Sequence, residues 1–388
     1  MAKRSRGLGV ACALLFAGGV PRLPAAPLGL PPVPIPSDNP QSAAKIALGD
    51  RLFHDKRFSS TGRVACANCH KAELVFTDGL KVSEGIHKLK GTRNAPTVVN
   101  AAYMKTLFWD GREPDLEGQS QQPFVNPVEM GLKNHDPILK IVRTDPKYAA
   151  AFRRVFGKSG AGITMTEVAR AIASFERTLV SGDSPFDRYY FAGDRRAMTA
   201  AQIRGFEVFV NQGRCVSCHT IEQTQALFTD NRFHNIGVGF KRIRGRENRL
   251  ARQFIAAKRG GANVDVTVLT QKDMSEMGRF AVTENLTQIG AFKTPTLRNV
   301  ALTAPYMHDG SLETLADVVD FYNNGGRLRK TDPVDDFQSG GIRPLNLTKR
   351  QKADLVAFLK ALTSPQYARR GGQRTAAVGA ARRERGQP

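Results

Sequence analysis

The pentapeptide Cys-x-x-Cys-His occurs twice in this chain of 388 residues, at 66–70 and again at 215–219. Two thiols three residues apart on one helical turn can form thioethers with both vinyl groups of a haem, and the histidine that follows can ligate the iron. A single Cys-x-x-Cys also occurs in zinc sites and in redox dithiols. Because the only other cysteine is Cys12, two complete copies favour two covalently bound c-type haems over either alternative.

The motif also predicts which residues hold each haem, called haem 1 for the first motif and haem 2 for the second. The cysteines form the thioethers and the trailing histidines are the proximal iron ligands. These residues are Cys66, Cys69 and His70 for haem 1, and Cys215, Cys218 and His219 for haem 2.

The first 26 residues have the pattern of a secretory signal peptide. Basic residues at 3, 4 and 6 precede an apolar run at 8–20, and two small residues follow at 25–26. That run is too short to span a bilayer, and no other stretch is apolar for long enough, so we expect no stable membrane insertion. An uncleaved anchor is the alternative. We therefore expect an exported, periplasmic protein whose residues 1–26, Cys12 included, are removed.

Charge restricts the partners. Lysine and arginine outnumber aspartate and glutamate by 57 to 35, which gives a formal net charge of +22. Export argues against nucleic acid as the partner. A field of this sign can steer an acidic electron donor or substrate protein toward the chain, or keep the chain soluble. Part of the excess lies in residues 365–388, which we expect to form a basic disordered tail.

A second similarity follows each haem motif. One copy reads Pro-Thr-Val-Val-Asn at 96–100 and Trp-Asp-Gly at 109–111; the other reads Pro-Thr-Leu-Arg-Asn at 295–299 and His-Asp-Gly at 308–310. The first proline lies fourteen residues before the aspartate in both copies, and a leucine lies six residues after it in both. This agreement of spacing predicts an internal duplication.

The pattern of apolar residues predicts an all-α fold of two cytochrome c-like haem domains with few short strands. Capping boxes open three helices, at Thr164, Thr199 and Thr348. The last of these helices carries leucines and a phenylalanine at helical spacing, as a helix packed on a haem domain does.

The composition of the segments between the expected helices predicts the domain boundaries. Residues 27–42 are rich in proline and should form an extended leader before a first helix at Ala43. The N-terminal, peroxidatic haem domain should cover 43–195 and the C-terminal, electron-transfer haem domain 196–364.

The motifs together resemble those of a known family. Besides the two haem motifs, the chain contains Asn-Ala-Pro-Thr at 94–97, Phe-Trp-Asp-Gly-Arg at 108–112 and Ala-Pro-Tyr-Met-His-Asp-Gly at 304–310. In this order they resemble the bacterial di-haem cytochrome c peroxidases and the related MauG proteins, over about residues 43–363. The resemblance implies an oxidoreductase that acts on hydrogen peroxide.

The duplication predicts that one iron is open and the other has two protein ligands. Thirteen residues past the aspartate of each repeat stand Pro123 in the first copy and Tyr322 in the second. Proline has no ligating atom. The resemblance agrees, since standard peroxidases carry methionine at the position of Tyr322 and MauG carries tyrosine; a phenolate is a harder donor and should lower the potential of haem 2. The alternative is a packed Tyr322, with Met307 or Met277 as the ligand.

On the open side of haem 1, the resemblance implies catalytic roles for Glu129 and Gln119. Peroxide must lose a proton from one oxygen and gain one on the other as its bond breaks, and a carboxylate is the usual shuttle. A surface glutamate at the end of a loop is the alternative. The family also places the residue matching Trp109, the only tryptophan, between the two haems, where an indole can relay an electron.

Two further sites come from the resemblance alone. His87 lies near the place of a histidine that caps the peroxidatic iron in standard peroxidases; we favour a solvated loop histidine, because Tyr322 argues for a MauG-type resting state. A calcium ion between the domains would take oxygens from Asn94, Thr303 and Pro305.

Three functions follow. The first is a MauG-like enzyme that stores oxidising equivalents on both haems and oxidises a partner protein. The second is a detoxifying peroxidase that receives electrons from a small cytochrome or copper protein. The third is a non-enzymatic di-haem electron carrier, against which Pro123 argues. Tyr322 favours the first function.

Overall fold

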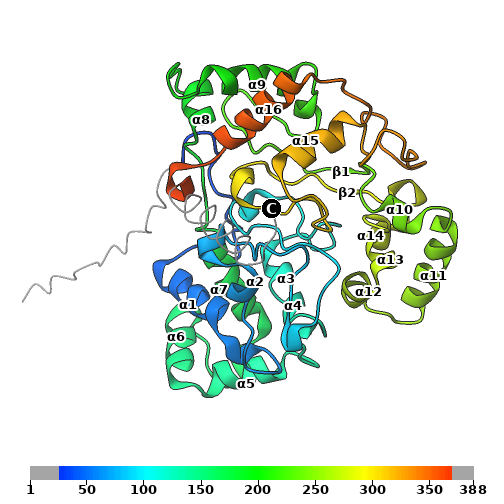
Figure 1. Cartoon of the computed structure of the whole chain (residues 1–388). Helices are drawn as coiled ribbons and strands as arrows, with labels where there is room; N and C mark the ends of the chain where they lie inside the picture. The colour runs from blue at the N-terminus through cyan, green and yellow to red at the C-terminus, as the bar shows by residue number, and fades with distance from the viewer. Residues whose placement is uncertain (1–25, 369–388) are drawn as a thin grey trace, which may run out of the picture.

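The computed structural model describes residues 26–368 and is mostly helical, with two short strands (Figure 1). This agrees with the all-α prediction. The signal peptide predicted for 1–26 lies outside the described residues except for Ala26. Within the described range, none of the helices combines the length and the apolar character needed to cross a membrane.

The N-terminal domain is built on a pair of helices, α1 and α7, that pack closely because Gly49 lets α1 approach the carbonyl of Ala171. Thr164 and Glu167 hydrogen bond to each other at the start of α7, as the capping box predicts. The helices of this domain are α1 (Ala43–His54), α2 (Cys66–Cys69), α3 (Leu116–Gln119), α4 (Gln122–Val125), α5 (Asp136–Thr144), α6 (Pro146–Phe156) and α7 (Met165–Glu176).

The C-terminal domain repeats this packing with α9 and α16. Gly205 of α9 lies against the carbonyl of Asp354 on α16, as Gly49 lies against Ala171. The capping boxes predicted at Thr199 and Thr348 are both present. The helices are α8 (Pro185–Tyr190), α9 (Ala200–Val210), α15 (Leu315–Asn323) and α16 (Lys349–Ala361). Phe186 of α8 packs in the core of this domain, although α8 lies before the predicted boundary at residue 195.

A lobe of short helices, residues 240–283, emerges between the second haem motif and the second repeat and lies beside both domains (Figure 1). It has an apolar core of its own, which includes Phe254, Met277 and Phe280. At its base, β1 (Phe233–His234) and β2 (Phe292–Lys293) pair antiparallel. Its helices are α10 (Phe240–Ile243), α11 (Glu247–Arg259), α12 (Val264–Thr270), α13 (Lys272–Ser275) and α14 (Phe280–Thr283).

A buried network of charges ties this lobe to the N-terminal domain. Asp110, 0% exposed, pairs with Arg93 and Arg112, and Arg112 also pairs with Asp265 of α12. Burial alone would raise the pKa of the Asp110 carboxyl, but the two arginines hold it well below its usual range. Arg93 also donates to the carbonyl of Ser275, 2.9 Å away. The network therefore fixes the Trp109–Gly111 segment against the lobe.

Replacing Asp110 with alanine is expected to destabilise the fold by roughly 3–5 kcal/mol, because it leaves buried arginines without their counter-charge. Denaturant unfolding followed by circular dichroism measures the change. Asp320 is the control: it makes an exposed ion pair with Lys352, so Asp320→Ala should cost about 0–1 kcal/mol. Equal effects of the two substitutions would contradict a structural role for the network.

Two main-chain hydrogen bonds join the domains in a reciprocal way. The amide of Asn94 donates to the carbonyl of His308, and the amide of Lys293 donates to the carbonyl of Trp109, both at 2.8 Å. The two donors match in the sequence, since Asn94 and Lys293 each stand two residues before the first proline of their segment. The two acceptors match as well, since Trp109 and His308 each stand directly before the aspartate.

The leader and the end of the described chain also bridge the domains. Residues 27–42 form neither helix nor strand, and the carbonyl of Gly29 accepts from Ala226 and Arg298 of the C-terminal domain. The tail was predicted to be disordered from residue 365, but residues 365–368 are helical and Tyr367 packs in the core of the N-terminal domain. An aromatic side chain at this point supplies the apolar area that orders the turn.

Candidate functional site

The first haem motif lines a cavity in the N-terminal domain, called cavity 1. The thiols of Cys66 and Cys69 and the imidazole of His70 lie in its wall, with apolar side chains such as Phe53, Leu116 and Ile172 around them. Cavity 1 encloses about 140 Å³. Pro123, Gln119 and Glu129, which sequence reasoning placed on the open side of haem 1, line the same cavity.

The second motif lines a larger cavity of about 490 Å³, called cavity 2. Cys215, Cys218 and His219 lie in its wall together with Tyr322 of α15 and Met307. Both cavities are lined by the segments 94–97 and 107–109. The two predicted haem sites are therefore neighbours that share one wall.

Both motif histidines are held in the orientation that an iron ligand needs. Nδ1 of His70 contacts the carbonyl of Phe76 at 3.1 Å, and Nδ1 of His219 contacts the carbonyl of Phe228 at 2.9 Å. This contact places the proton on Nδ1 and leaves Nε2 as the free donor atom. Burial lowers the pKa of both imidazoles, which keeps them neutral, as ligation requires.

The residues present fit a haem at each site by their donor set. Each motif supplies two cysteines that form no disulfide, and burial raises the pKa of Cys69 and of Cys215 to about 12. Cavity 1 also contains two carboxyl oxygens without a hydrogen-bond partner, one each on Glu129 and Glu176. Thiols, a neutral imidazole and apolar walls suit covalent haem at both sites.

The lining of cavity 2 includes only two of the three residues proposed as the second axial ligand of haem 2. Met277 is 0% exposed within the core of the lobe and does not line cavity 2. Tyr322 and Met307 both line it. Burial raises the pKa of the Tyr322 phenol, so a proton would leave only when a cation such as iron takes its place. The geometry therefore excludes Met277 as the second axial ligand of haem 2 and leaves Tyr322 and Met307 as the candidates.

Glu129 has the environment of a proton-transferring group. Its carboxyl lies in cavity 1, and Oε2 has no hydrogen-bond partner among the described residues. Burial, followed by the charge of Asp265, raises its pKa to about 8. A carboxyl tuned to near-neutral pH can both accept and return a proton.

Trp109 stands in the wall between the two cavities and lines both of them. Its indole Nε1 donates to the carbonyl of Asn94 at 2.9 Å, which fixes the plane of the ring. This is the position that the resemblance implied for an electron relay.

The three residues predicted to bind calcium all line cavity 2: Asn94, Thr303 and Pro305. The side-chain amide of Asn94 donates to the carbonyl of Leu80 at 2.8 Å. That bond leaves the side-chain oxygen of Asn94 available, and an oxygen donor suits a hard cation.

His87 does not lie with these residues. It is exposed in the turn Ile86–Lys88, has a positive φ of 52°, and lines neither cavity. Ile86, not His87, is buried there, and its amide donates to the carbonyl of Glu129.

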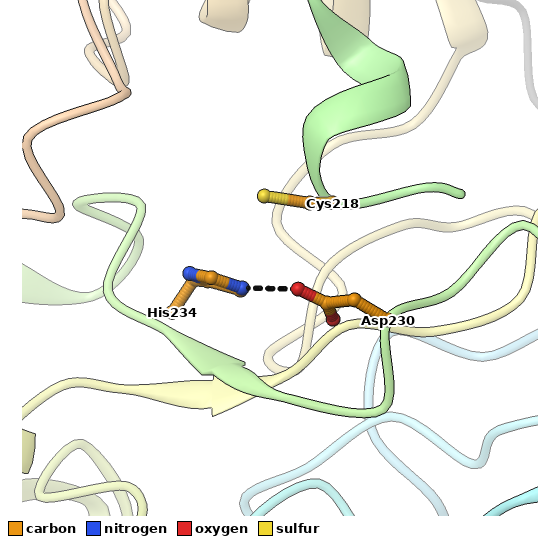
Figure 2. A group of neighbouring side chains, drawn as sticks. All are labelled: Cys218, Asp230 and His234. Carbon is orange, nitrogen blue, oxygen red and sulfur yellow. Dashed lines mark hydrogen bonds and ion pairs between the residues drawn. The ribbon is translucent and has the colours of Figure 1, made fainter.

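Near cavity 2, Cys218, Asp230 and His234 come together, and Nε2 of His234 pairs with Asp230 at 2.7 Å (Figure 2). The hydrogen bond to Cys218, with that to Asp230, raises the pKa of His234 to about 9. Sulfur, nitrogen and oxygen donors could hold zinc, but tetrahedral zinc usually has four ligands. Within residues 26–368 no fourth such side chain joins the group, and Cys218 belongs to the haem motif.

Sequence reasoning missed three polar residues that line these cavities or act on a residue that does. Asp265 of the lobe lines neither cavity, but its charge acts on Glu129. The lobe has no counterpart in the first half of the chain, so no spacing indicated this residue. Lys293 lines cavity 2, and burial lowers its pKa to about 8. Glu176 lines cavity 1; the signal for it was available, as a glutamate directly after the apolar run that closes the first domain.

Comparisons with known proteins agree with this geometry. The sequence model of the family "Di-haem cytochrome c peroxidase" matches residues 43–196. The cytochrome-c peroxidase IdrP1 of Denitromonas iodatirespirans is 38% identical, over 87% of this chain and 86% of the relative. The methylamine utilization protein MauG of Methylorubrum extorquens is 36% identical, over 85% of this chain and 81% of the relative.

A solved structure is similar as well. The crystal structure of a MauG-like protein associated with microbial copper homeostasis matches with a TM-score of 0.72 and 33% identity, covering 89% of this chain and 97% of that one. These findings confirm the resemblance, the two haem cofactors and the enzyme class predicted from the motifs. The chain belongs to the family of di-haem cytochrome c peroxidases and MauG proteins and is an oxidoreductase of that family.

Proposed function

We propose that this protein is an exported di-haem peroxidase that takes oxidising equivalents from hydrogen peroxide, stores them on both haems and oxidises a partner protein in the manner of MauG. The observation that carries the proposal is the asymmetry of the cavities: Pro123 stands in cavity 1, and Tyr322 stands in cavity 2. Proline leaves one coordination position free for peroxide, whereas a phenol oxygen can close the other.

Two residues of cavity 1 have separate roles toward peroxide, one in proton transfer and one in orientation. Bound haem supplies the iron chemistry. Glu129 accepts a proton from one peroxide oxygen and returns it to the other, for which its raised pKa suits it. Gln119 lies in the same cavity, where its amide can orient peroxide by donating to one oxygen.

Trp109 is the relay between the two sites in this proposal. It is the only tryptophan and lines both cavities, and its hydrogen bond to Asn94 holds it there. The amide of Lys293 donates a hydrogen bond to the carbonyl of Trp109, which ties Trp109 to the C-terminal domain.

Further parts of the proposal concern architecture. The reciprocal bonds of Asn94 and Lys293 and the matching glycine contacts of α1 and α9 support an origin by duplication. The packing of Phe186 in the C-terminal core favours a domain boundary before α8, earlier than residue 195. The side-chain oxygen of Asn94, in a cavity that Thr303 and Pro305 also line, supports an interdomain calcium ion. Periplasmic location rests on the signal-like pattern of residues 1–26.

A second candidate is a detoxifying peroxidase that receives electrons from a small cytochrome or copper protein. Two observations favour it: the relative named above is a cytochrome-c peroxidase, and Met307 lines cavity 2 beside Tyr322. In either case the net charge of +22 favours an acidic redox partner. A non-enzymatic carrier needs a ligand in place of Pro123.

Rapid mixing of the resting ferric protein with peroxide, without any reductant, tests the proposal. We expect the spectra of both haems to change in that single reaction. A protein that reacts only after one haem has been reduced belongs with the detoxifying peroxidases, and one that never reacts is a carrier.

Replacing His87 with alanine is expected to leave both the resting high-spin signal and the direct reaction with peroxide unchanged, because His87 is exposed and outside cavity 1. Paramagnetic resonance and rapid mixing measure the two properties. His54→Ala, which removes an exposed histidine of α1, is the control. A variant that gains a high-spin signal the wild type lacks identifies His87 as a cap.

A further inference from the structure

Glu176, the last residue of α7, is a buried carboxyl that the proposed mechanism does not use. It is 5% exposed and lines cavity 1. Its Oε2 has no hydrogen-bond partner among the described residues. A buried carboxyl without a partner costs free energy, so its presence in a haem cavity calls for a chemical reason.

The C-terminal domain contains a matched position without the carboxyl. Gly49 of α1 lies against Ala171 and Phe175, and Gly205 of α9 lies against Asp354 and Phe358 in the same way. Counting one residue on from each phenylalanine pairs Glu176 with Leu359. Leu359 lines cavity 2 as Glu176 lines cavity 1. Leucine is thus compatible with this place in the fold, and glutamate is particular to cavity 1.

The basic groups at the end of α7 and on α1 do not neutralise Glu176, because they are bound elsewhere, and only Arg177 acts on its pKa. The neighbouring Arg177 makes two hydrogen bonds to Glu117 of α3, at 2.7 and 2.8 Å. Lys45 of α1 donates to Asn39 and to the carbonyl of Pro40.

The other titratable groups near the end of α7 do not supply a counter-charge either. Cys66 of α2 is a thiol that haem attachment consumes, and the exposed His54 of α1 pairs with Asp50. Burial raises the pKa of Glu176 to about 8; Glu117 adds to the rise and Arg177 opposes it. Glu176 is therefore poised to change protonation in response to a new charge in cavity 1.

We propose that Glu176 is a redox-linked proton site of cavity 1. When a one-electron donor reduces haem 1, the carboxylate of Glu176 takes up one proton from solvent, and it releases that proton when the electron leaves. The charge of the cavity is then the same before and after. The proposal rests on haem attachment at Cys66 and Cys69, and not on the fate of the oxidising equivalents.

The sign of the pH dependence follows. The added electron favours the protonated carboxyl, so the pKa of Glu176 is higher with reduced than with oxidised haem. Between these two pKa values reduction takes up a proton, and the potential of haem 1 falls as pH rises. For one proton per electron, a tenfold change in proton concentration shifts the potential by about 59 mV.

Spectroelectrochemical titration of the holoprotein over about pH 6 to pH 9 tests this, with the wild type, Glu176→Gln and Glu176→Leu. We expect the wild-type potential of haem 1 to fall with pH and both variants to lose the part of that slope that Glu176 supplies. Glu129, whose pKa is also raised to about 8 in cavity 1, supplies the part that remains. Haem 2, whose cavity contains Leu359, is the internal control and should keep its own slope in all three proteins. Infrared difference spectra of the wild type should show a carboxylic C=O band that forms on reduction and is missing in Glu176→Gln.

Stability separates this role from a structural one. Because Leu359 occupies the matched place, Glu176→Leu should unfold at a temperature no lower than the wild type. A variant that unfolds earlier and keeps the wild-type slope marks Glu176 as structural and overturns the proposal. A pH-independent potential in the wild type overturns it as well. Neither result depends on peroxide or on a partner protein, so both are distinct from a failure of the proposed function.

Discussion

Replacing Glu129 with glutamine is expected to slow the reaction with peroxide by about 10²- to 10⁴-fold, the usual range for removing a positioned acid–base group. Glutamine cannot accept the first proton of peroxide, yet it preserves the size of the side chain. The carboxyl lies in cavity 1 with a free oxygen, so the resting haem spectra should barely change. Stopped-flow mixing with peroxide measures the rate.

The pH profile adds a second signature of Glu129. Its pKa is raised to about 8, so the carboxyl is mostly protonated at neutral pH and ionises as pH rises through that value. Only the ionised form can accept a proton. The wild-type rate should therefore climb with pH and level off above about pH 8, and the glutamine variant should lose this climb.

Glu113 supplies a matched control. It is partly buried, is bonded to Gln122 at 2.7 Å, and does not line cavity 1. Glu113→Gln should therefore react nearly as fast as the wild type. If Glu129→Gln did so too, Glu129 would leave the mechanism, and Gln119 or a chain of water molecules would remain as the proton carrier.

Replacing Tyr322 with methionine is expected to keep both haems attached while changing the axial ligand of haem 2 and raising its potential. A thioether stabilises reduced iron better than a phenolate does. The rise should be on the order of a few hundred millivolts, within the roughly 0.8 V that axial ligands span. Potentiometry and the low-spin resonance signal measure the two effects. The storage of oxidising equivalents on both haems should fail.

Met307→Leu is the control for this experiment, since Met307 lines the same cavity. If Tyr322 is the ligand, the leucine variant keeps the wild-type low-spin signal. An unchanged signal in Tyr322→Met, together with a changed one in Met307→Leu, would reassign the ligand to the methionine.

Much of the site was predictable because local rules and repeated spacing determine it. Thr164, Thr199 and Thr348 start helices as their capping boxes indicate. The count from each repeat's aspartate brought Pro123 and Tyr322 to opposite cavities. Trp109 reached the shared wall because the segment around it pairs with the other domain.

Other features depend on tertiary packing that no spacing encodes. The lobe at 240–283 is built from short helices without a counterpart in the first repeat. As a result Asp265, whose charge acts on Glu129, could not be located in advance. The basic composition around Tyr367 predicted a disordered tail. The buried ring of Tyr367 instead orders the turn of helix at 365–368.

The low-temperature paramagnetic resonance spectrum of the resting ferric protein tests the central claim most directly, because it reports the ligation of both irons at once. We expect one high-spin haem, open beside Pro123, and one low-spin haem with histidine and tyrosine as its axial ligands. Two low-spin haems, or a second haem with histidine and methionine as ligands, would contradict it.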